Sequence, residues 1–484
     1  MEQGAAAGFV GSGQTEGVAT CLARPMSRDI SVDLVVIGLG PGGEHLATEA
    51  AKAGLSVVGV DERLVGGECP YYGCIPSKMA IRAANTLAEA RRVGTLAGAA
   101  EVAPDWGTVF TRIRDEATDD WDDRVAVERL EKAGVHFVRG HGRLAGPGVV
   151  EVAGTRYAAA RGVVLNTGTT PTAPPVDGLA DSPYWTNRDA LATAQLPASM
   201  VVVGGGAIGV ELAQVFARFG TKVSLVEAAP RILAAEEPEA ADVVADALTA
   251  DGIQLLAGAS LDRVRHAEGQ FALAVTDAVG TRVELRVDRV LVAAGRRPNI
   301  TDMGLDTVGL DPGAPAVDTD ERMRAGERLW AIGDITGKGA FTHMSMYQAD
   351  VALRDILGQD GHPAEYHAVP RVTYTDPEVG SVGMTEERAR RAGLDVAVGC
   401  AALSASTRGW IHGPGGDGLV KLVEDRGAGH LVGATSVGPM GGEVLAMLAT
   451  AVHARVPTAT LQAMPLAYPT FTRAVETALA DLAD

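Results

Sequence analysis

The chain has 484 residues, of which 46% are hydrophobic and 21% are charged, so it is long enough for about three domains and has a globular composition. Its 61 acidic and 42 basic residues give a formal net charge of −19, which would repel nucleic acid phosphates and anionic lipid headgroups. The sequence has no run of 18 apolar residues and no secretory signal, so we expect a cytoplasmic protein with no nucleic acid or membrane partner.

The first 29 residues are rich in Gly, Ala, Ser and Thr and lack a sustained hydrophobic period. We therefore expect residues 1–29 to be a disordered leader. The segment that begins at Met26 could itself be a translation start.

The first folded unit begins as a strand, a glycine turn, a helix and a second strand. Gly38, Gly40 and Gly43 fit the pattern G-x-G-x-x-G directly after the first strand, where the absent side chains let a pyrophosphate approach the helix N-terminus. Asp61 ends the second strand, where a carboxylate can accept hydrogen bonds from ribose hydroxyls. Glu62 is a weaker candidate for that role, and ordinary glycine packing is the structural alternative.

Two of the four cysteines, Cys69 and Cys74, lie five positions apart in GGECPYYGCIPSK and are followed by Lys78. In a regular helix their Cα atoms would be about 8 to 9 Å apart, beyond the ~7 Å that a disulfide spans. Pro70 and Gly73 allow a distorted backbone, and a strained disulfide in a reducing cytosol is more often catalytic than structural. Two buried free thiols remain the alternative. A metal site would need further closely spaced Cys or His residues, so no metal is expected.

The middle of the chain repeats the first pattern. Residues 79–133 predict mainly helix, short strands follow up to Leu165, and the Pro-rich loop TGTTPTAPPVDG indicates a crossing between domains. A second strand, glycine turn, helix and strand then begin at Met200. This repeat predicts a second nucleotide-binding unit.

The second glycine turn consists of Gly204, Gly206 and Gly209, and Glu227 ends the strand that follows. An acid at this position favours the free 2′-hydroxyl of NADH over the 2′-phosphate of NADPH. Arg231 lies close by in sequence and is the reason to keep NADPH as an alternative.

The remaining segments predict how the units are assembled. VDRVLVAAGRRPN closes the second unit, LWAIGDITG returns to strand and glycine, and strands then alternate with two helices. We therefore expect an α/β protein with two Rossmann-like dinucleotide-binding domains and a C-terminal α+β domain. The expected boundaries are 30–165 and 291–360 for the first domain, 166–290 for the second and 361–484 for the third.

Together these motifs resemble the pyridine nucleotide-disulfide oxidoreductases, the family of dihydrolipoamide dehydrogenase, glutathione reductase and mercuric reductase. GGECPYYGCIPSK looks like the redox-active disulfide of that family. The other matches, in the family's order, are the two glycine turns, NTGTTP, AAGRRPN, AIGDITG, YTDPEVGSVGMTE and GLVKLVEDRGAGHLVGATSVGP. The resemblance runs from about Asp33 to the C-terminus. It implies that the first domain binds FAD, the second binds NADH, and the third pairs two subunits into a homodimer.

The resemblance also implies roles for single residues. Cys69 would be the interchange thiol that faces a small-molecule substrate, and Cys74 the charge-transfer thiol against the flavin. Lys78 would lie beside the flavin, paired with Glu211. The other residues that would line the cofactors are Gly142, Thr167, Gly168, Gly295, Asp334 on the ribityl chain, and the stretch near His343.

The sequence departs from the family near its C-terminus. The family pattern His-x-His-Pro-Thr-x-x-Glu supplies a general base from the partner subunit, but the corresponding stretch here is LAYPTFTR, residues 466–473. Tyr468, with an ordinary pKa of about 10, would be a poor base that can still donate a hydrogen bond. Lipoamide and glutathione disulfide are therefore not expected as substrates, and the absence of a cysteine after Cys400 disfavours mercury reduction. Arg473 indicates either an anionic substrate or a surface salt bridge.

Four functional hypotheses remain after this departure. The first is a reductase of a small disulfide or oxidised sulfur compound, in which Cys69 and Cys74 cycle. The second is a flavin diaphorase that reduces quinones without the cysteines. The third is a flavoprotein component of a larger assembly, and the fourth is non-redox chemistry by a cysteine thiolate.

Overall fold

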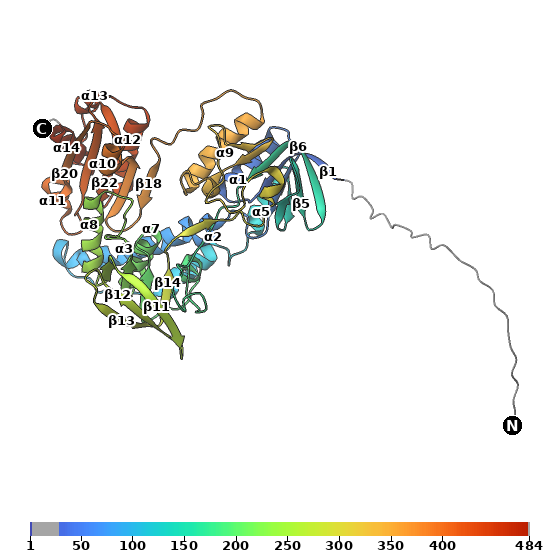
Figure 1. Ribbon diagram of the computed structural model, residues 1–484. Coiled ribbons are helices and arrows are strands. Elements are labelled where there is room, and N and C mark those ends of the chain that lie inside the picture. Colours follow the sequence, from blue (N-terminus) through green and yellow to red (C-terminus); the bar gives the residue numbers. More distant parts are fainter. Residues whose placement is uncertain (2–28, 483–484) are drawn as a thin grey trace.

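The computed structural model describes Met1 and residues 29–482. Residues 2–28, which include most of the expected leader and Cys21, lie outside the described residues. Figure 1 shows three folded units: the first at the right in blue, teal and gold, the second below in green, and the third at the upper left in orange and red. The fold is α/β.

The first unit is built on an eight-stranded sheet with the main order β16-β17-β6-β1-β2-β3. Its strands are β1 (Ile30–Ile37), β2 (Val57–Asp61), β3 (Val135–Arg139), β4 (Gly142–Leu144), β5 (Val149–Val152), β6 (Thr155–Leu165), β16 (Arg324–Gly326) and β17 (Leu329–Ala331). Strand β1 pairs in parallel with β2 and β6, so its end is buried in the centre of the sheet. Helices α1 (Pro41–Lys52) and α9 (Thr342–Ile356) pack against each other.

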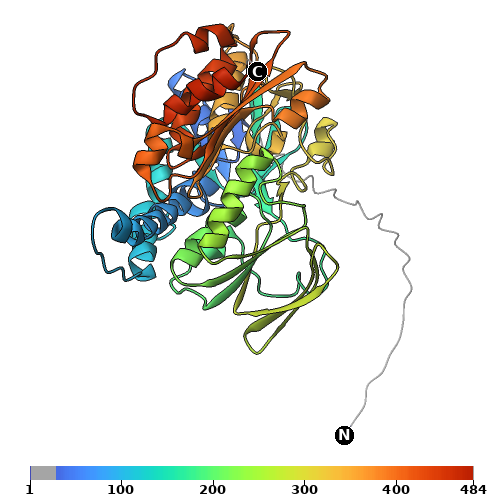
Figure 2. The ribbon, with the colours of Figure 1, turned by 90° about the vertical axis from the view of Figure 1, so that its left-hand side faces the viewer.

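The helical segment that carries the cysteines begins earlier than residue 79. Helix α2 (Glu68–Tyr72) ends at Gly73, and helix α3 (Cys74–Leu96) starts directly after it. Helix α4 (Trp106–Thr111), a π-helical turn (Arg112–Ala117) and α5 (Arg124–Lys132) follow. The stretch predicted as helix, 79–133, is therefore interrupted twice, between Leu96 and Trp106 and between Ala117 and Arg124. The first interruption contains Gly98, whose φ of 133° is outside the helical range. In Figure 2 the blue helices of this segment project at the lower left.

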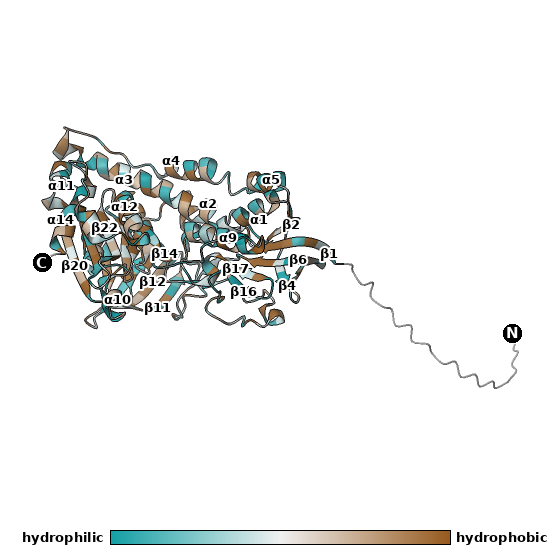
Figure 3. Ribbon diagram, turned by 90° about the horizontal axis from the view of Figure 1, so that it is seen from above, coloured by the Kyte–Doolittle hydropathy of each residue, from teal (hydrophilic) through white to brown (hydrophobic). Residues whose placement is uncertain are grey.

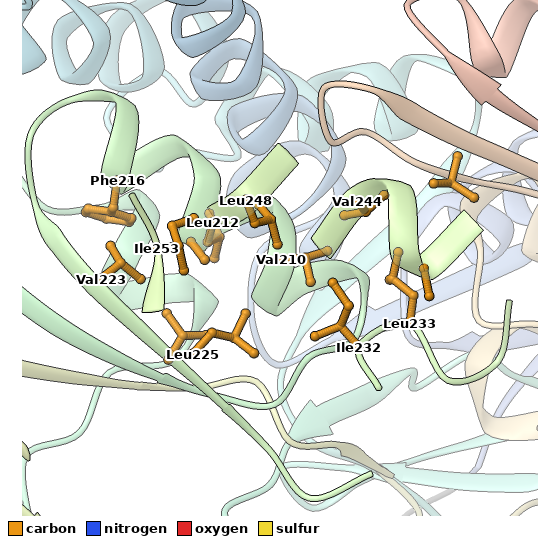
Figure 4. Packing of buried hydrophobic residues seen from close by; sticks show 14 of the residues in the cluster. Val210, Leu212, Phe216, Val223, Leu225, Ile232, Leu233, Val244, Leu248 and Ile253 are labelled. Carbon is orange, nitrogen blue, oxygen red and sulfur yellow. The ribbon is translucent and has the colours of Figure 1, made fainter. Parts of the chain in front are cut away.

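The second unit has a four-stranded parallel sheet of order β10-β9-β8-β14 and a three-stranded antiparallel sheet. Its elements are β8 (Ser199–Val203), α7 (Ala207–Arg218), β9 (Lys222–Glu227), α8 (Pro238–Ala250), β10 (Gln254–Ala257), β11 (Ser260–Ala267), β12 (Gln270–Thr276), β13 (Arg282–Val287) and β14 (Arg289–Val292). Figure 4 shows apolar side chains of α7, α8 and β9, among them Phe216 and Leu248, packed into one core. This packing fixes the glycine turn before α7.

A two-stranded ribbon joins the first and second units. Strand β7 (Thr169–Pro171) carries the chain into the second unit, and β15 (Arg296–Pro298) carries it back as its antiparallel partner. The short helix α6 (Asn187–Leu191) and the 3-10 turns at Leu305–Val308 and Gly333–Thr336 flank this crossing. The boundary expected at residue 290 falls inside β14, because this strand stays paired with β8 up to Val292.

The third unit is a five-stranded antiparallel sheet of order β18-β19-β22-β21-β20 with helices against it. Its elements are β18 (Pro370–Thr373), β19 (Glu378–Gly383), α10 (Glu386–Arg391), β20 (Val396–Ala402), α11 (Thr407–His412), β21 (Leu419–Asp425), β22 (His430–Gly438), α12 (Gly441–His453), α13 (Thr458–Gln462) and α14 (Ala474–Asp481), with short 3-10 turns at Leu403–Ala405 and Phe471–Arg473. Figure 3 shows hydrophobic and hydrophilic stretches alternating along helices α3 and α4. No helix in the described part of the chain is long and apolar enough to cross a membrane.

Candidate functional site

A cavity of about 1780 Å³ lies where the three units meet. It is lined by the first glycine turn, by the cysteine segment, by the crossing ribbon, by the start of α7 and by β18 with α12 of the third unit. Of the residues predicted from the sequence, those that line it are Gly38, Gly40, Asp61, Cys69, Cys74, Lys78, Gly142, Thr167, Gly168, Gly206, Glu211, Gly295, Asp334 and His343. The cavity thus gathers residues from distant parts of the sequence.

The first glycine turn brings backbone groups close together at the start of α1. Gly38 has a φ of 91°, and a Cβ there would lie 2.3 Å from the carbonyl oxygen of Asn166. A Cβ on Gly43 would lie 2.0 Å from the carbonyl oxygen of Gly38. Only glycine fits at these positions, and the exposed N-terminus of α1 beside Gly40 can receive a phosphate group.

Asp61 lies at the end of β2 on the wall of the cavity. Its carboxylate accepts hydrogen bonds from the backbone N–H groups of Leu39 and Arg63, both at 2.8 Å. Burial raises the pKa of Asp61. The neighbouring Glu62 instead contacts the ring of His141, 3.0 Å away. Asp61 is therefore the carboxylate held in place at this end of the cavity.

Asp334 lies in the 3-10 turn after β17, which is parallel to β2 and three strand positions away from it in the sheet. The hydroxyl of Thr169 donates to its carboxylate at 2.9 Å, and burial raises the pKa of Asp334. Thr167 donates to the carbonyl of Asn299 at 2.7 Å, which ties together the two chain crossings. His343, in the first turn of α9, lies 2.9 Å through Nε2 from the carbonyl oxygen of Pro370.

The two cysteines face each other across the break between α2 and α3. Gly73, with φ −133° and ψ −117°, interrupts the helix between them, so the backbone is distorted as the spacing requires. Both are thiols in this structure. The side-chain hydrogen bond with Cys69 lowers the pKa of Cys74 to about 6 and raises that of Cys69. The Sγ atom of Cys74 also lies 3.3 Å from the hydroxyl of Thr342.

Lys78 and Glu211 form an ion pair one helical turn beyond Cys74. The Nζ atom of Lys78 lies 2.9 Å from Oε2 of Glu211, whose side chain is 6% exposed. The other oxygen of Glu211 accepts the backbone N–H of Tyr374 at 2.8 Å, and Lys78 lies over the Tyr374 ring. Glu211 thus joins the cysteine helix, the second unit and the third unit.

The second glycine turn repeats the geometry of the first. Gly204 has a φ of 109°, and a Cβ on Gly209 would lie 1.9 Å from the Gly204 carbonyl oxygen. Glu227, at the end of β9, accepts hydrogen bonds from the backbone N–H groups of Gly205 at 2.5 Å and Ala229 at 2.6 Å. Its carboxylate is fixed beside the turn.

Tyr468 and Arg473 do not line the cavity within one chain. Tyr468 is 65% exposed and its hydroxyl lies 3.3 Å from that of Thr407 on α11. Arg473 lies over the Tyr468 ring and forms an ion pair with Glu476 at 3.1 Å. The arrangement matches the surface salt bridge and gives no support, within one chain, to an anion-binding role of Arg473.

The structure adds site residues that sequence reasoning missed. Thr342 contacts Cys74, and Glu68 binds Arg188 and Arg296. These residues and Tyr374 line the same cavity. Glu68 could have been suspected because it precedes Cys69, and Tyr374 because it begins the motif YTDPEVGSVGMTE, whereas no local pattern marks Arg188. No group of three His, Cys, Asp or Glu side chains in the described ranges could hold a metal ion.

Comparison with known proteins gives consistent matches along most of the chain. The model of the pyridine nucleotide-disulphide oxidoreductase family matches residues 32–354, and that of its dimerisation domain matches residues 369–479. A dihydrolipoyl dehydrogenase of Halobacterium salinarum is 35% identical over 442 residues, 88% of this chain and 91% of the relative. A mercuric reductase of Lysinibacillus sphaericus is 28% identical over 446 residues, 91% of this chain and 81% of the relative.

A solved structure shares the arrangement of all three units. The HOCl-induced flavoprotein disulfide reductase RclA from Escherichia coli superimposes with a TM-score of 0.80 at 25% identity, over 93% of this chain and 99% of that chain. Two nucleotide-type glycine turns, a facing cysteine pair and a dimerisation domain agree with these matches. The chain belongs to the pyridine nucleotide-disulphide oxidoreductase family, whose members use FAD and a pyridine nucleotide.

Proposed function

We propose that the chain is an FAD-dependent NADH oxidoreductase whose Cys69 and Cys74 cycle between dithiol and disulfide and reduce a small disulfide or oxidised sulfur substrate. For a disulfide the balance is NADH + H⁺ + RSSR → NAD⁺ + 2 RSH. The observation that carries the proposal is the hydrogen-bonded thiol pair on the cavity wall, in which the pKa of Cys74 is lowered to about 6. A thiolate at neutral pH is the form that attacks sulfur.

The residues of the first unit fit FAD. The glycine turn leaves no room for a Cβ at Gly38 or Gly43, so a pyrophosphate can approach the start of α1. Asp61 and Asp334 offer two further carboxylates on the cavity wall. FAD, when bound, supplies a two-electron carrier between the nicotinamide and the thiols. With the boundary moved from residue 290 to the end of β14, we assign residues 30–165 and 293–360 to this domain, 166–292 to NADH binding and 361–484 to pairing in a homodimer.

The second unit favours NADH over NADPH. Glu227 is held by two backbone N–H groups at the end of β9, where its charge opposes a 2′-phosphate. The Nη2 atom of Arg231 is directed to the carbonyls of Ala234 and Glu236, to which it donates at 3.2 Å. We expect kcat/KM for NADH to exceed that for NADPH at least tenfold, and Glu227→Ala to reduce this preference.

Within the cysteine pair, Cys74 can accept the proton that a histidine of the partner subunit accepts elsewhere in the family. Cys69 carries the proton of the reduced pair, and Cys74 is its hydrogen-bond acceptor. As Cys69 attacks the substrate disulfide, its proton passes to the Cys74 sulfur, and a thiolate of the substrate leaves. Attack by Cys74 on the mixed disulfide then releases the second substrate thiol and restores the Cys69–Cys74 bond.

Thiol counting under anaerobic conditions tests the proposal. Addition of NADH to the oxidised FAD-loaded protein should yield two new thiols per chain, and Cys69→Ala should abolish both the new thiols and disulfide reduction. If the flavin is reduced while the thiol count stays constant, the proposal is wrong.

A diaphorase is the second candidate, because Tyr468 lies away from the cavity of its own chain and offers no base there. A quinone reductase should keep its activity in Cys69→Ala. For the disulfide reductase we propose a cytoplasmic setting, because disulfides in a reducing compartment are usually catalytic.

A further inference from the structure

Glu68, the residue directly before Cys69, joins two arginines that come from distant segments. Its Oε1 accepts the Nε–H of Arg188 at 2.5 Å, and its Oε2 accepts an Nη2–H of Arg296 at 3.0 Å. The three side chains are only 23 to 29% exposed. These charge-assisted bonds therefore lie in a partly desolvated wall of the cavity, where they are stronger than surface pairs.

The two arginines are held in place by further contacts around α2. The Arg188 guanidinium, on α6, lies 5.5 Å from the ring centre of Tyr72, at the end of α2. Arg296, on the crossing ribbon, also donates to the hydroxyl and carbonyl of Thr169 at 2.7 and 2.9 Å. Both guanidinium groups would therefore stay beside the cysteine segment even without Glu68.

The other charged side chains on this part of the cavity wall also have partners. Lys78, which lowers the pKa of Cys74, is paired with Glu211. Asp334 accepts a hydrogen bond from Thr169. The charge of Arg296 lowers the pKa of Asp334, and the charge of Glu68 raises it. Glu68 is the carboxylate that bonds directly to both arginines. Its loss would leave two guanidinium groups without this partner on the cavity wall that also carries the cysteine pair.

We propose that Glu68 is a positioning residue of the cysteine pair: by binding Arg188 and Arg296, its single negative charge offsets about half of their combined positive charge, and it keeps the pair more reducing than these cations alone would leave it. Reduction of the disulfide breaks the S–S bond and takes up two electrons and one proton, which leaves one thiol and one thiolate. A more positive surrounding favours the thiolate and therefore the reduced state. This inference rests on the proposed cycling of Cys69 and Cys74.

Alkylation of the reduced protein tests the charge effect without requiring turnover. We expect Glu68→Gln to lower the pH at which iodoacetamide modifies Cys74 at half its maximal rate, and Arg188→Gln to raise it. Glu128→Gln, which removes the partner of Arg124 on the exposed face of α5, should leave this pH unchanged. Glu68→Asp keeps the charge and should stay closer to the wild type than Glu68→Gln.

A purely mechanical role makes a different prediction. Both Glu68→Gln and Arg188→Gln break the same ion pair, so a structural effect would shift the pH midpoint in the same direction in both variants, and that result would overturn the proposal. If Glu68→Gln fails to fold, Arg188→Gln must still raise the midpoint by itself, and an unchanged midpoint there would overturn it as well.

Equilibration with glutathione measures the redox consequence and separates the two proposals. At a fixed glutathione potential, the ratio of reduced to oxidised pair should rise about threefold or more in Glu68→Gln and fall by a similar factor in Arg188→Gln; threefold corresponds to about 14 mV. If NADH yields no new thiols in the wild-type protein, the proposed disulfide cycle fails. The alkylation midpoints still decide whether Glu68 balances the two arginines.

Discussion

Cys74 is the thiol of the pair that ionises first, because Cys69 and Thr342 both offer hydrogen bonds to its sulfur. Its pKa of about 6 lies below the ordinary value, so the thiolate is present at neutral pH and is lost as the pH falls through 6. Thr342→Val should raise this pKa by up to about one unit, because one hydrogen bond contributes ~1 kcal/mol. The pH dependence of alkylation, in a Cys21→Ser and Cys400→Ser background, checks this, and an unchanged midpoint would contradict it.

Glu211 is a single residue on which three units depend. Its carboxylate holds Lys78 and the backbone of Tyr374, and its side chain is 6% exposed. Glu211→Ala should lower the free energy of unfolding by about 2 to 4 kcal/mol, because it leaves Lys78 and a buried N–H group without their partner. Denaturant unfolding of the FAD-loaded protein measures this. The exposed Glu128→Ala should change stability by less than about 0.5 kcal/mol.

At the scale of elements, the glycine turn before α1 must stay free of side chains. In Gly43→Ala the new Cβ would lie 2.0 Å from the carbonyl oxygen of Gly38, so the turn must open. We expect FAD to bind about tenfold more weakly, measured as flavin released on dilution. Gly94→Ala is the matched control, because nothing lies within 4 Å of a Cβ there and alanine favours the helix α3. Equal flavin retention in both variants would contradict the prediction.

The strands and helices next to the glycine turns are the part of the fold that the sequence predicts most accurately. The order of apolar run, glycines, helix and acid is a local pattern, and the structure places it as β1, α1, β2 and as β8, α7, β9. Helix α3 starts at Cys74, earlier than the expected helical start at residue 79, and it contains Pro76 in its first turn, where proline is well tolerated. Contacts such as Glu68 with Arg188 could not be predicted, because they depend on how separate units pack.

At the scale of the whole molecule, buried ion clusters hold the second unit against its neighbours. Arg218, 2% exposed at the end of α7, pairs with Asp251 of its own unit and with Asp376 of the third unit. At the other end of α8, Lys421 of β21 forms ion pairs with Glu237, the N-cap of that helix, and with Glu239. The two clusters therefore attach both ends of α8 to the third unit.

Lys421 is the cation that balances several carboxylates in the second of these clusters. Its side chain is 3% exposed and lies 3.0 Å from Glu237 and from Glu386, and these bonds raise the pKa of Lys421 and lower that of Glu386. Lys421→Met should lower the free energy of unfolding at pH 7 by about 3 to 5 kcal/mol, because it leaves buried carboxylates unpaired.

The pH dependence gives the sign of this effect. The lowered pKa of Glu386 means that its contribution is present above its ordinary pKa and is lost as the pH falls, so the stability difference between Lys421→Met and the wild type should shrink toward pH 4. The double variant Lys421→Met with Glu237→Gln should recover part of the loss at pH 7, since it removes the most buried of the unpaired charges. If the stability difference is the same at pH 7 and pH 4, Lys421 stabilises the protein through packing. The contact between the second and third units would then not depend on the charge of Lys421.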